Sequence, residues 1–505
     1  MLRVVTALQP SWRGGYTQRV DTESNSFCTL YDLPPELITL VIETLCLDQD
    51  VFSPNDPAAP TITEDLLALC RTSSILKGCA TPFLYRKVST LKTPRTCRLL
   101  LRTLATKPRL ATQIKHLHVK LWTGWTRGGL SLRDRVDILE SLPLHVRPLS
   151  THGSLPKLLA NGDHDAETAV LIALAVNVES LILQTFIEDD KVPTHSDSDL
   201  AMATFAHLTA HGGLPHLRHL HLKHQEGYSR PYMMDVRAHI SRLHHRTLDT
   251  LIVEDGFSPG ETWFAQDAGS APKLRSLDLA NCKVQARATA RAICSFTGLR
   301  NLTFSCIEYY YRGAVEDWGQ VFDILPTHAA TLENLRVMAY EPISQPIHFK
   351  WNEMVALKSL TIPSDLLLFR SPDTLLEEDP LLYVEGESLA GVLALPRSLE
   401  ALHVTTTHHL HDLRRMLVTI LPAITECMHT LELHFVDEED TRSAIGDFHG
   451  VDSLELDGIC LSISSETIKF AYRGSDWNTV SKYCARAQEL NSVFEPFLEV
   501  GGLCV

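Results

Sequence analysis

Apolar side chains recur at helical spacing near the start of the chain. In residues 31–45, YDLPPELITLVIETL, positions 37, 38, 41, 42 and 45 are apolar and fall on one stripe of a helix. Pro34 and Pro35 stand at the start of the stripe, and proline is favoured in a first turn, where its missing N–H is not needed. Asp32 is well placed as the N-cap. The pattern predicts an amphipathic helix of about three turns that begins beside Pro35.

A second helical pattern follows a break that contains proline. Residues 48–63 hold Pro54, Pro57 and Pro60, so we expect a loop here rather than a regular helix. Thr63 precedes two acidic residues, an order typical of an N-cap followed by first-turn acids that complement the helix dipole. An apolar face then runs on to Leu76, and Pro82 is expected to close the piece. Periodicity alone does not exclude a small helical cap that covers the end of a larger domain.

After about residue 110 the pattern changes to short L-x-x-L-x-L units, each able to form a strand with inward leucines. The fourth positions of nine such units are Leu220, Leu251, Leu277, Leu302, Leu335, Leu360, Leu402, Leu431 and Leu454. Most gaps lie near the leucine-rich-repeat length of about 20 to 29 residues. Helix-like pieces at 286–296 and 411–421 stand between strands. The alternation predicts an irregular leucine-rich-repeat solenoid.

In such strands the side chains between the leucines point away from the core. They would line the concave face, which is polar and of mixed charge, and this composition suits a protein ligand better than a small apolar molecule. The predicted client-binding residues are His219, His221, Glu254, Asp278, Thr303, Arg336 and His403.

The N-terminal segment also resembles the F-box of many fungal F-box proteins. LPPELI at 33–38 looks like its start, and LLALCRTS at 66–73 with PFLYR at 82–86 looks like its remainder. The resemblance covers residues 31–90 and implies a three-helix module that docks on a Skp1-like adaptor, and thereby on a cullin ubiquitin ligase. The adaptor-binding residues that it implies are Leu33, Pro34, Leu37, Ile38, Val41, Leu66, Leu67 and Leu69. Part of the same stripe must form the module's own core, and the sequence does not divide the two.

Composition narrows the function classes. Hydrophobic residues make up 44% and charged residues 21% of the 505-residue chain, which is typical of a globular protein. A formal charge of -15 argues against a surface built on phosphate neutralisation, so no nucleic-acid partner is expected. No apolar run is long enough to cross a bilayer, so no membrane partner is expected. The 12 cysteines include no C-x-x-C pair and favour free thiols in the cytoplasm or nucleus.

No motif for catalysis, a cofactor or a metal is present. The chain lacks G-x-S-x-G, a P-loop, G-x-G-x-x-G and H-E-x-x-H, so we expect no enzyme activity and no cofactor. The histidine-rich stretch at 407–411 has no nearby cysteine or H-E-x-x-H glutamate, and solvated histidines explain it. The acidic run at 437–440 lacks the spacing of a calcium loop. No metal site is predicted.

These patterns together predict an α/β fold with a small N-terminal three-helix F-box-like module followed by an irregular leucine-rich-repeat solenoid. The predicted segments are a tail (1–30), the F-box-like module (31–90), linking helices and irregular first repeats (91–215), the repeat array (216–470) and a C-terminal cap or tail (471–505). The resemblance implies a substrate-recognition subunit of a Skp1–cullin ubiquitin ligase that also binds an unknown protein client. The alternative is a leucine-rich-repeat scaffold unrelated to ubiquitin, whose N-terminal helices cap the solenoid.

Overall fold

The structure is a computed structural model of the whole chain. The residues that it describes are 33–47, 59–90, 94–122, 130–142, 155–186, 204–205, 207–208, 213–225, 234–235, 247–254, 256–258, 273–280, 282–306, 317–339, 349–367, 395–406, 430–435, 453–456, 459–463 and 467–472.

The chain divides into two compact units and passes between them more than once. The first unit comprises Met1–Val119, Trp125–Leu181 and Leu214–His216, and the second comprises Lys120–Gly124, Ile182–Gly213 and Leu217–Val505. Two of the crossings fall inside strands, β2 (His116–Trp122) and β3 (Ser180–Phe186).

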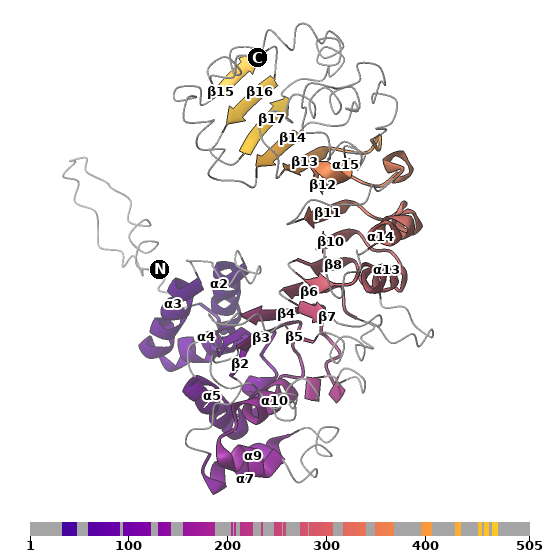
Figure 1. Cartoon of the computed structure of the whole chain (residues 1–505). Coiled ribbons are helices and arrows are strands. Elements are labelled where there is room, and N and C mark those ends of the chain that lie inside the picture. The colour runs from indigo at the N-terminus through magenta and orange to yellow at the C-terminus, as the bar shows by residue number, and fades with distance from the viewer. Residues whose placement is uncertain are drawn as a thin grey trace, which may run out of the picture. The chain divides into compact units, whose positions relative to one another are not determined.

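The first unit is mainly helical (Figure 1). Besides its parts of β2 and β3, it contains α2 (Pro35–Leu47), α3 (Ala59–Thr72), α4 (Ser74–Arg86), β1 (Lys87–Ser89), α5 (Pro94–Thr106), α6 (Pro108–Ala111), α7 (Leu132–Ser141), α9 (Leu155–Asn161) and α10 (His164–Leu174). Strand β1 follows α4 directly and pairs in parallel with β2, with Val88 beside Leu117. Helix α10 is buried along its whole length. The first unit therefore combines packed helices with a short stretch of sheet.

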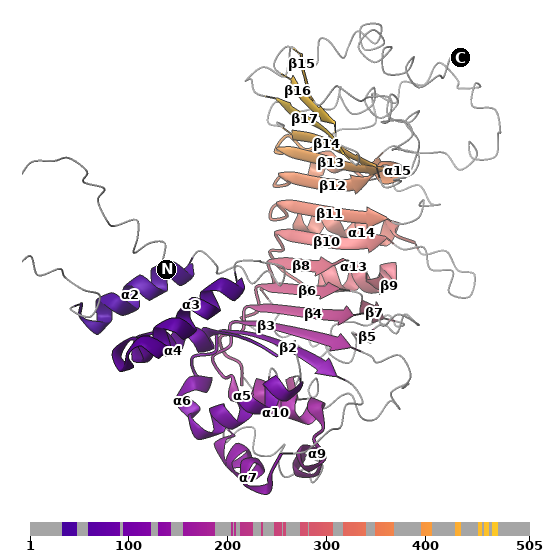
Figure 2. The ribbon, with the colours of Figure 1, turned by 90° about the vertical axis from the view of Figure 1, so that its left-hand side faces the viewer.

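The second unit is built on strands that follow one another in sequence order, as Figure 2 shows. They are β4 (His219–Gln225), β6 (Thr250–Glu254), β8 (Ser276–Leu279), β10 (Asn301–Cys306), β11 (Asn334–Ala339), β12 (Ser359–Pro363), β13 (Ala401–Thr406) and β14 (Thr430–Phe435). Each pairs with the next in parallel and in the same register, so that Leu277, Leu302 and Leu335 stand side by side. The leucines of the repeating pattern are buried from Leu220 to Leu402.

Short helices pack on one side of these strands (Figure 1). They are α13 (Ala286–Cys294), α14 (Gly319–Ile324), the 3-10 turns η2 (Leu325–His328) and η3 (Trp351–Glu353), and α15 (Ser364–Leu367). Small buried residues such as Ala288 and Ala292 bring α13 close to its neighbours. The buried ring of His328 lies 3.1 Å from the carbonyl oxygen of Ile293, and this contact ties η2 to α13.

The sheet changes direction after β14. Three further strands continue it in the order β17 (Thr467–Tyr472), β16 (Ile459–Ile463) and β15 (Ser453–Leu456), and all of their pairings are antiparallel. A separate small parallel sheet joins β5 (Met234–Asp235), β7 (Gly256–Ser258) and β9 (Lys283–Val284). The last leucine of the series, Leu454, therefore lies on an antiparallel hairpin.

The predicted architecture of a three-helix F-box-like module followed by a leucine-rich-repeat solenoid is wrong. In the residues that the structure describes, α2, α3 and α4 belong to a larger unit, and α4 runs directly into strand β1 of its sheet, so they do not stand apart as a module. The connections between parallel strands also vary, and the sheet ends in antiparallel strands. The fold is α/β with a long, mostly parallel sheet. The L-x-x-L-x-L pattern specifies strands buried on one side, but it does not specify what joins them.

Two predicted helix boundaries are also wrong. Helix α3 begins at Ala59, so Thr63 lies inside it rather than capping it, and Pro60 occupies the first turn, where proline is tolerated. Helix α4 begins after Ser73, whose Oγ accepts a hydrogen bond from the backbone N–H of Leu76 at 3.1 Å. Pro82 lies within α4 instead of ending it.

None of the helices in the described parts of the chain has the length and apolar character needed to span a membrane.

Candidate interaction surfaces

Helices α2, α3 and α4 share a small hydrophobic core. Its buried members are Ile38, Ile42, Leu66, Leu76 and Ala80, and its partly buried members are Leu33, Cys46, Leu69, Cys70, Cys79, Phe83 and Leu84. Ile38 and Ile42 are four residues apart on α2 and so point the same way. An ion pair between Arg86 and Glu43, 3.8 Å apart and partly exposed, links the end of α4 to α2.

The apolar face of α2 is wider than this core requires. Leu37, Leu40 and Val41 lie beside the buried stripe at spacings of three and four, and they are 46%, 56% and 42% exposed. Leu67 on α3 and Ile75 on α4 are also exposed. Within the described residues, five of the nine large exposed apolar side chains lie on these three helices. Unpaired apolar surface of this kind is typical of a site that binds another protein.

The structure divides the adaptor-binding residues predicted from the sequence. Ile38 and Leu66 are core residues, and Leu33 and Leu69 are half-buried against them. The exposed ones are Pro34, Leu37, Val41 and Leu67. Leu40 and Ile75 are exposed apolar residues outside the predicted adaptor-binding set, although the spacing of Leu40 from Leu37 was a usable signal.

Five of the seven predicted client-binding residues lie in one row across the parallel strands. In-register pairing connects His221, Ile252, Asp278, Thr303, Arg336, Thr361 and His403 in that order. His219 lies in the adjacent row, and Glu254 pairs with Lys223. All seven predicted residues are exposed or half-buried, and they alternate with buried leucines. The row offers hydrogen-bonding groups of both charges at the spacing of neighbouring strands, about 4.8 Å.

Charged groups at one end of this face hold each other in place. Glu254 lies between a lysine and a histidine, with its oxygens 2.6 Å from Nζ of Lys223 and 3.2 Å from Nε2 of His221. Burial lowers the pKa of His221, and Lys223 lowers it further, while Glu254 opposes the change. Burial raises the pKa of Asp278, against the opposing effects of the Ala280 backbone N–H and Arg336. These fixed polar groups can bind a peptide, but the described part of the face contains no activated nucleophile.

No protein-family model matches the chain, and no curated protein matches it. The functional assignment therefore depends on the side chains and their surroundings.

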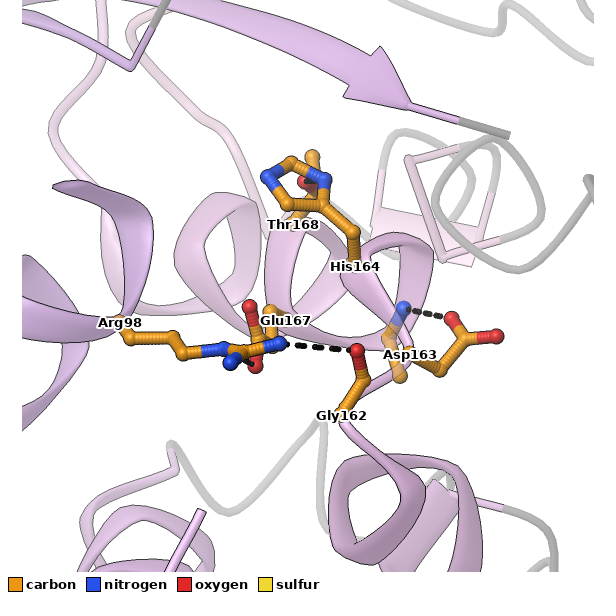
Figure 3. Close-up of polar contacts among 7 residues, drawn as sticks. Arg98, Gly162, Asp163, His164, Glu167 and Thr168 are labelled. Carbon is orange, nitrogen blue, oxygen red and sulfur yellow. Dashed lines mark hydrogen bonds and ion pairs between the residues drawn. The ribbon is translucent and has the colours of Figure 1, made fainter. Parts of the chain in front are cut away.

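A cluster of polar side chains is buried in the first unit, between α5 and α10 (Figure 3). Nε of Arg98 donates to Oε1 of Glu167 at 2.5 Å, and its Nη2 donates to the carbonyl oxygen of Gly162 at 3.0 Å. Gly162 adopts a positive φ of 71°, which a residue with a side chain rarely does, and this turn leads into α10. Asp163 then caps α10 by accepting the backbone N–H of Ala166 at 2.9 Å.

The side chains of this cluster are shielded from solvent. Glu167 is fully buried, and burial raises its pKa to about 7, although Arg98 opposes the rise. Burial likewise lowers the pKa of His164 to about 4 and raises the pKa of the Cys97 thiol far above its usual value. The sequence reasoning did not find this cluster, because its members come from distant helices. The two stretches that it weighed as metal sites, 407–411 and 437–440, lie outside the described residues.

Proposed function

We propose that this chain is a substrate-recognition subunit of a Skp1–cullin ubiquitin ligase. It would bind a Skp1-like adaptor through α2 and its neighbours, and a client protein through the polar row of the parallel sheet. The chain would contribute binding only, because holding a client beside a separate ubiquitin-transferring enzyme accelerates the transfer by proximity. The resemblance of residues 31–90 to fungal F-box proteins names the adaptor.

The observation that carries this proposal is the exposed half of the apolar face of α2. Core residues such as Ile38 already hold α2 in place, so Leu37, Leu40 and Val41 are not needed for packing. Burying a leucine or valine against a partner stabilises the complex by about 1.5 to 3 kcal/mol. Three such side chains on one helix supply a hot spot of the size that protein interfaces use.

The polar row supports the second half of the proposal. Its members come from separate strands that the parallel register holds side by side, so a client would meet a preformed surface. Preformed groups lose little side-chain freedom on binding, which favours affinity. Charges of both signs select a client by complementarity rather than by bulk charge.

The adaptor half is tested by a pull-down of the full chain with purified Skp1. The parent is compared with Leu37→Asp/Val41→Asp, which changes two exposed residues four apart on α2. The matched control is Leu132→Asp/Val136→Asp, because these residues are also exposed, also four apart and also in the first unit. We expect the α2 variant to lose affinity by about 100-fold or more and the α7 control to bind like the parent.

Ile38 is unsuitable for this test, because it is buried and its change to Asp would unfold the helices. Circular dichroism must show that both double variants are folded. Failure of the folded parent to bind Skp1, or equal binding by both variants, would contradict the adaptor role. A protein-binding function outside ubiquitin ligases would then be the better interpretation.

The client half is tested with Arg336→Glu/His403→Glu, which reverses or introduces charge at two exposed or half-buried positions of the row. We expect this variant to keep full Skp1 binding while losing the client proteins that copurify with the parent and ligase. Loss of Skp1 binding as well would show that the two surfaces are not independent.

A further inference from the structure

Three side chains of the kinds that ligate metals meet inside the first unit. They are Cys97 on α5, and His164 and Glu167 on α10, and one potential ligand atom of each lies within 4.8 Å of the other two. His164 and Glu167 are three residues apart and therefore share a face of α10. All three residues are buried. Burial separates this group from surface clusters of acids, which need no metal to explain them.

Two atoms of the group have no hydrogen-bond partner. Oε2 of Glu167 and Nε2 of His164 are both buried and unpaired. The other atoms of these side chains are occupied, since Oε1 accepts from Arg98 and Nδ1 of His164 lies 3.3 Å from Oγ1 of Thr168. Leaving a buried polar atom unpaired costs about 1 to 3 kcal/mol, so two in one cluster point to a missing partner.

The positive charge of Arg98 opposes a cation, but Arg98 leaves one carboxylate oxygen of Glu167 without a partner. Its guanidinium contacts Oε1 of Glu167 and the carbonyl of Gly162, and so orients the carboxylate without occupying Oε2. Outer partners of this kind fix many metal-ligating side chains. Asp163 lies close enough to Glu167 to influence its charge, which offsets the positive charge of Arg98.

We propose that Cys97, His164 and Glu167 bind one Zn²⁺ ion that fastens α5 to α10. A thiolate, an imidazole and a carboxylate together are a ligand set that zinc accepts, and tetrahedral coordination leaves one position for a water molecule. On binding, the Cys97 thiol releases its proton to the buffer and becomes the thiolate ligand. The buried position makes the role structural, because a substrate has no access to the ion.

The first test measures metal in the full chain, purified without a histidine tag from cells grown with added zinc. We expect about one zinc ion per chain by elemental analysis. Protein from cells grown with cobalt should show the near-ultraviolet thiolate-to-cobalt charge-transfer band and the visible bands of tetrahedral cobalt. These measurements use the unaltered chain and do not depend on any variant folding.

The second test locates the ion. Cys97→Ala and His164→Gln should abolish the cobalt–thiolate band and reduce zinc to a small fraction of that in the parent. Cys79→Ala is the matched control, because Cys79 is a partly buried free thiol in the same unit and not part of the cluster. It should keep both the metal and the band.

A folded parent without zinc and without the cobalt–thiolate band would overturn the proposal. Full metal content in Cys97→Ala would overturn it too, because the ion would then be held elsewhere. If Cys97→Ala does not fold, the parent's thiolate band together with its retention in Cys79→Ala supports the site, and its loss in Cys79→Ala refutes it.

Discussion

The helices α2 to α4 and the strands β4 to β14 differ in the polarity of the exposed side chains beside their cores. On α2 the neighbours of the core residue Ile38 include exposed apolar side chains, such as Leu37 and Val41. On the strands most neighbours of the buried leucines are polar, with Ile252 and Ala401 as exceptions, and several polar side chains pair with each other, as Glu254 does with Lys223. The two regions therefore present surfaces of different chemistry.

This difference indicates two kinds of partner. Exposed leucine and valine side chains are stabilised by removal from water, so the helical surface suits a partner that stays bound. The side chains of the polar row are mostly hydrophilic, so a partner gains there chiefly from well-placed hydrogen bonds and charges. The sheet face thus suits a ligand that is selected and later released. The following changes test how sharply the two regions differ, from the largest effect to the smallest.

The largest effect should come from the core of the sheet. Leu335→Ala removes a buried side chain from the middle of the parallel strands, and we expect a loss of about 2 to 5 kcal/mol of unfolding free energy. Arg336→Ala changes its exposed neighbour and should cost less than about 0.5 kcal/mol. Urea unfolding followed by tryptophan fluorescence measures both, because Trp318 and Trp351 are buried in the same unit. Equal losses would remove the distinction between core and face.

On α2, the difference in stability loss between a core substitution and a surface substitution should be smaller than on the sheet. Ile38→Ala should destabilise the helices by about 2 kcal/mol, at the low end of the range, because the partly buried residues around this small core can move into the space. Leu37→Ala should cost less than about 0.5 kcal/mol. Hydrogen exchange of α2 and α4 reports this local stability directly. A larger loss for Leu37→Ala than for Ile38→Ala would reverse our assignment of core and surface.

A weaker effect is expected from a single polar contact on the sheet face. The side-chain nitrogen of Asn334 donates to Oδ1 of Asn301 at 2.6 Å, and the pair is exposed to solvent. We expect Asn334→Ala to cost about 0.5 kcal/mol. A double-mutant cycle with Asn301→Ala isolates the contact. Strict additivity of the two changes would show that the contact contributes no stability.

The smallest effect is a shift in the titration of His221. Because burial and Lys223 lower its pKa, we expect a midpoint below 6.5 by NMR. Neutral His221 favours folding, so its contribution to stability is present above pH 6.5 and is lost as the pH falls through the lowered pKa. Lys223→Met should raise the midpoint and Glu254→Gln should lower it further. A midpoint above 6.5 would mean that Glu254 dominates.

The sequence predicted the strands of the second unit well, and for a clear reason. Alternation with a period of two identifies a strand from local residues alone, and the leucines from Leu220 to Leu402 all lie buried on strands. The architecture could not be read in the same way, because the antiparallel pairing of β15 with β16 depends on residues outside the pattern. The same L-x-x-L-x-L pattern is present in parallel strands and in the antiparallel strand β15.

The sequence alone could not distinguish the exposed from the buried apolar residues of α2. Leu37 and Ile38 are adjacent on one apolar stripe, and the packing of residues from α3 and α4, such as Leu66 and Leu76, decides which of them is buried. The buried cluster was even less accessible, since 69 residues separate Arg98 from Glu167. The one local signal was His164 and Glu167 on a shared helix face after the capping residue Asp163.

The path of the chain between the two units governs how the protein can be cut for experiments. The backbone leaves the first unit within β2, returns near residue 125, and leaves again within β3. A fragment that stops at residue 119 or starts at residue 182 therefore breaks a strand and leaves its hydrogen-bonding groups unpaired. Expression of either half alone should yield insoluble protein, whereas single substitutions in the full chain leave these strands whole. Experiments on this protein should therefore use single substitutions in the full chain rather than truncated fragments.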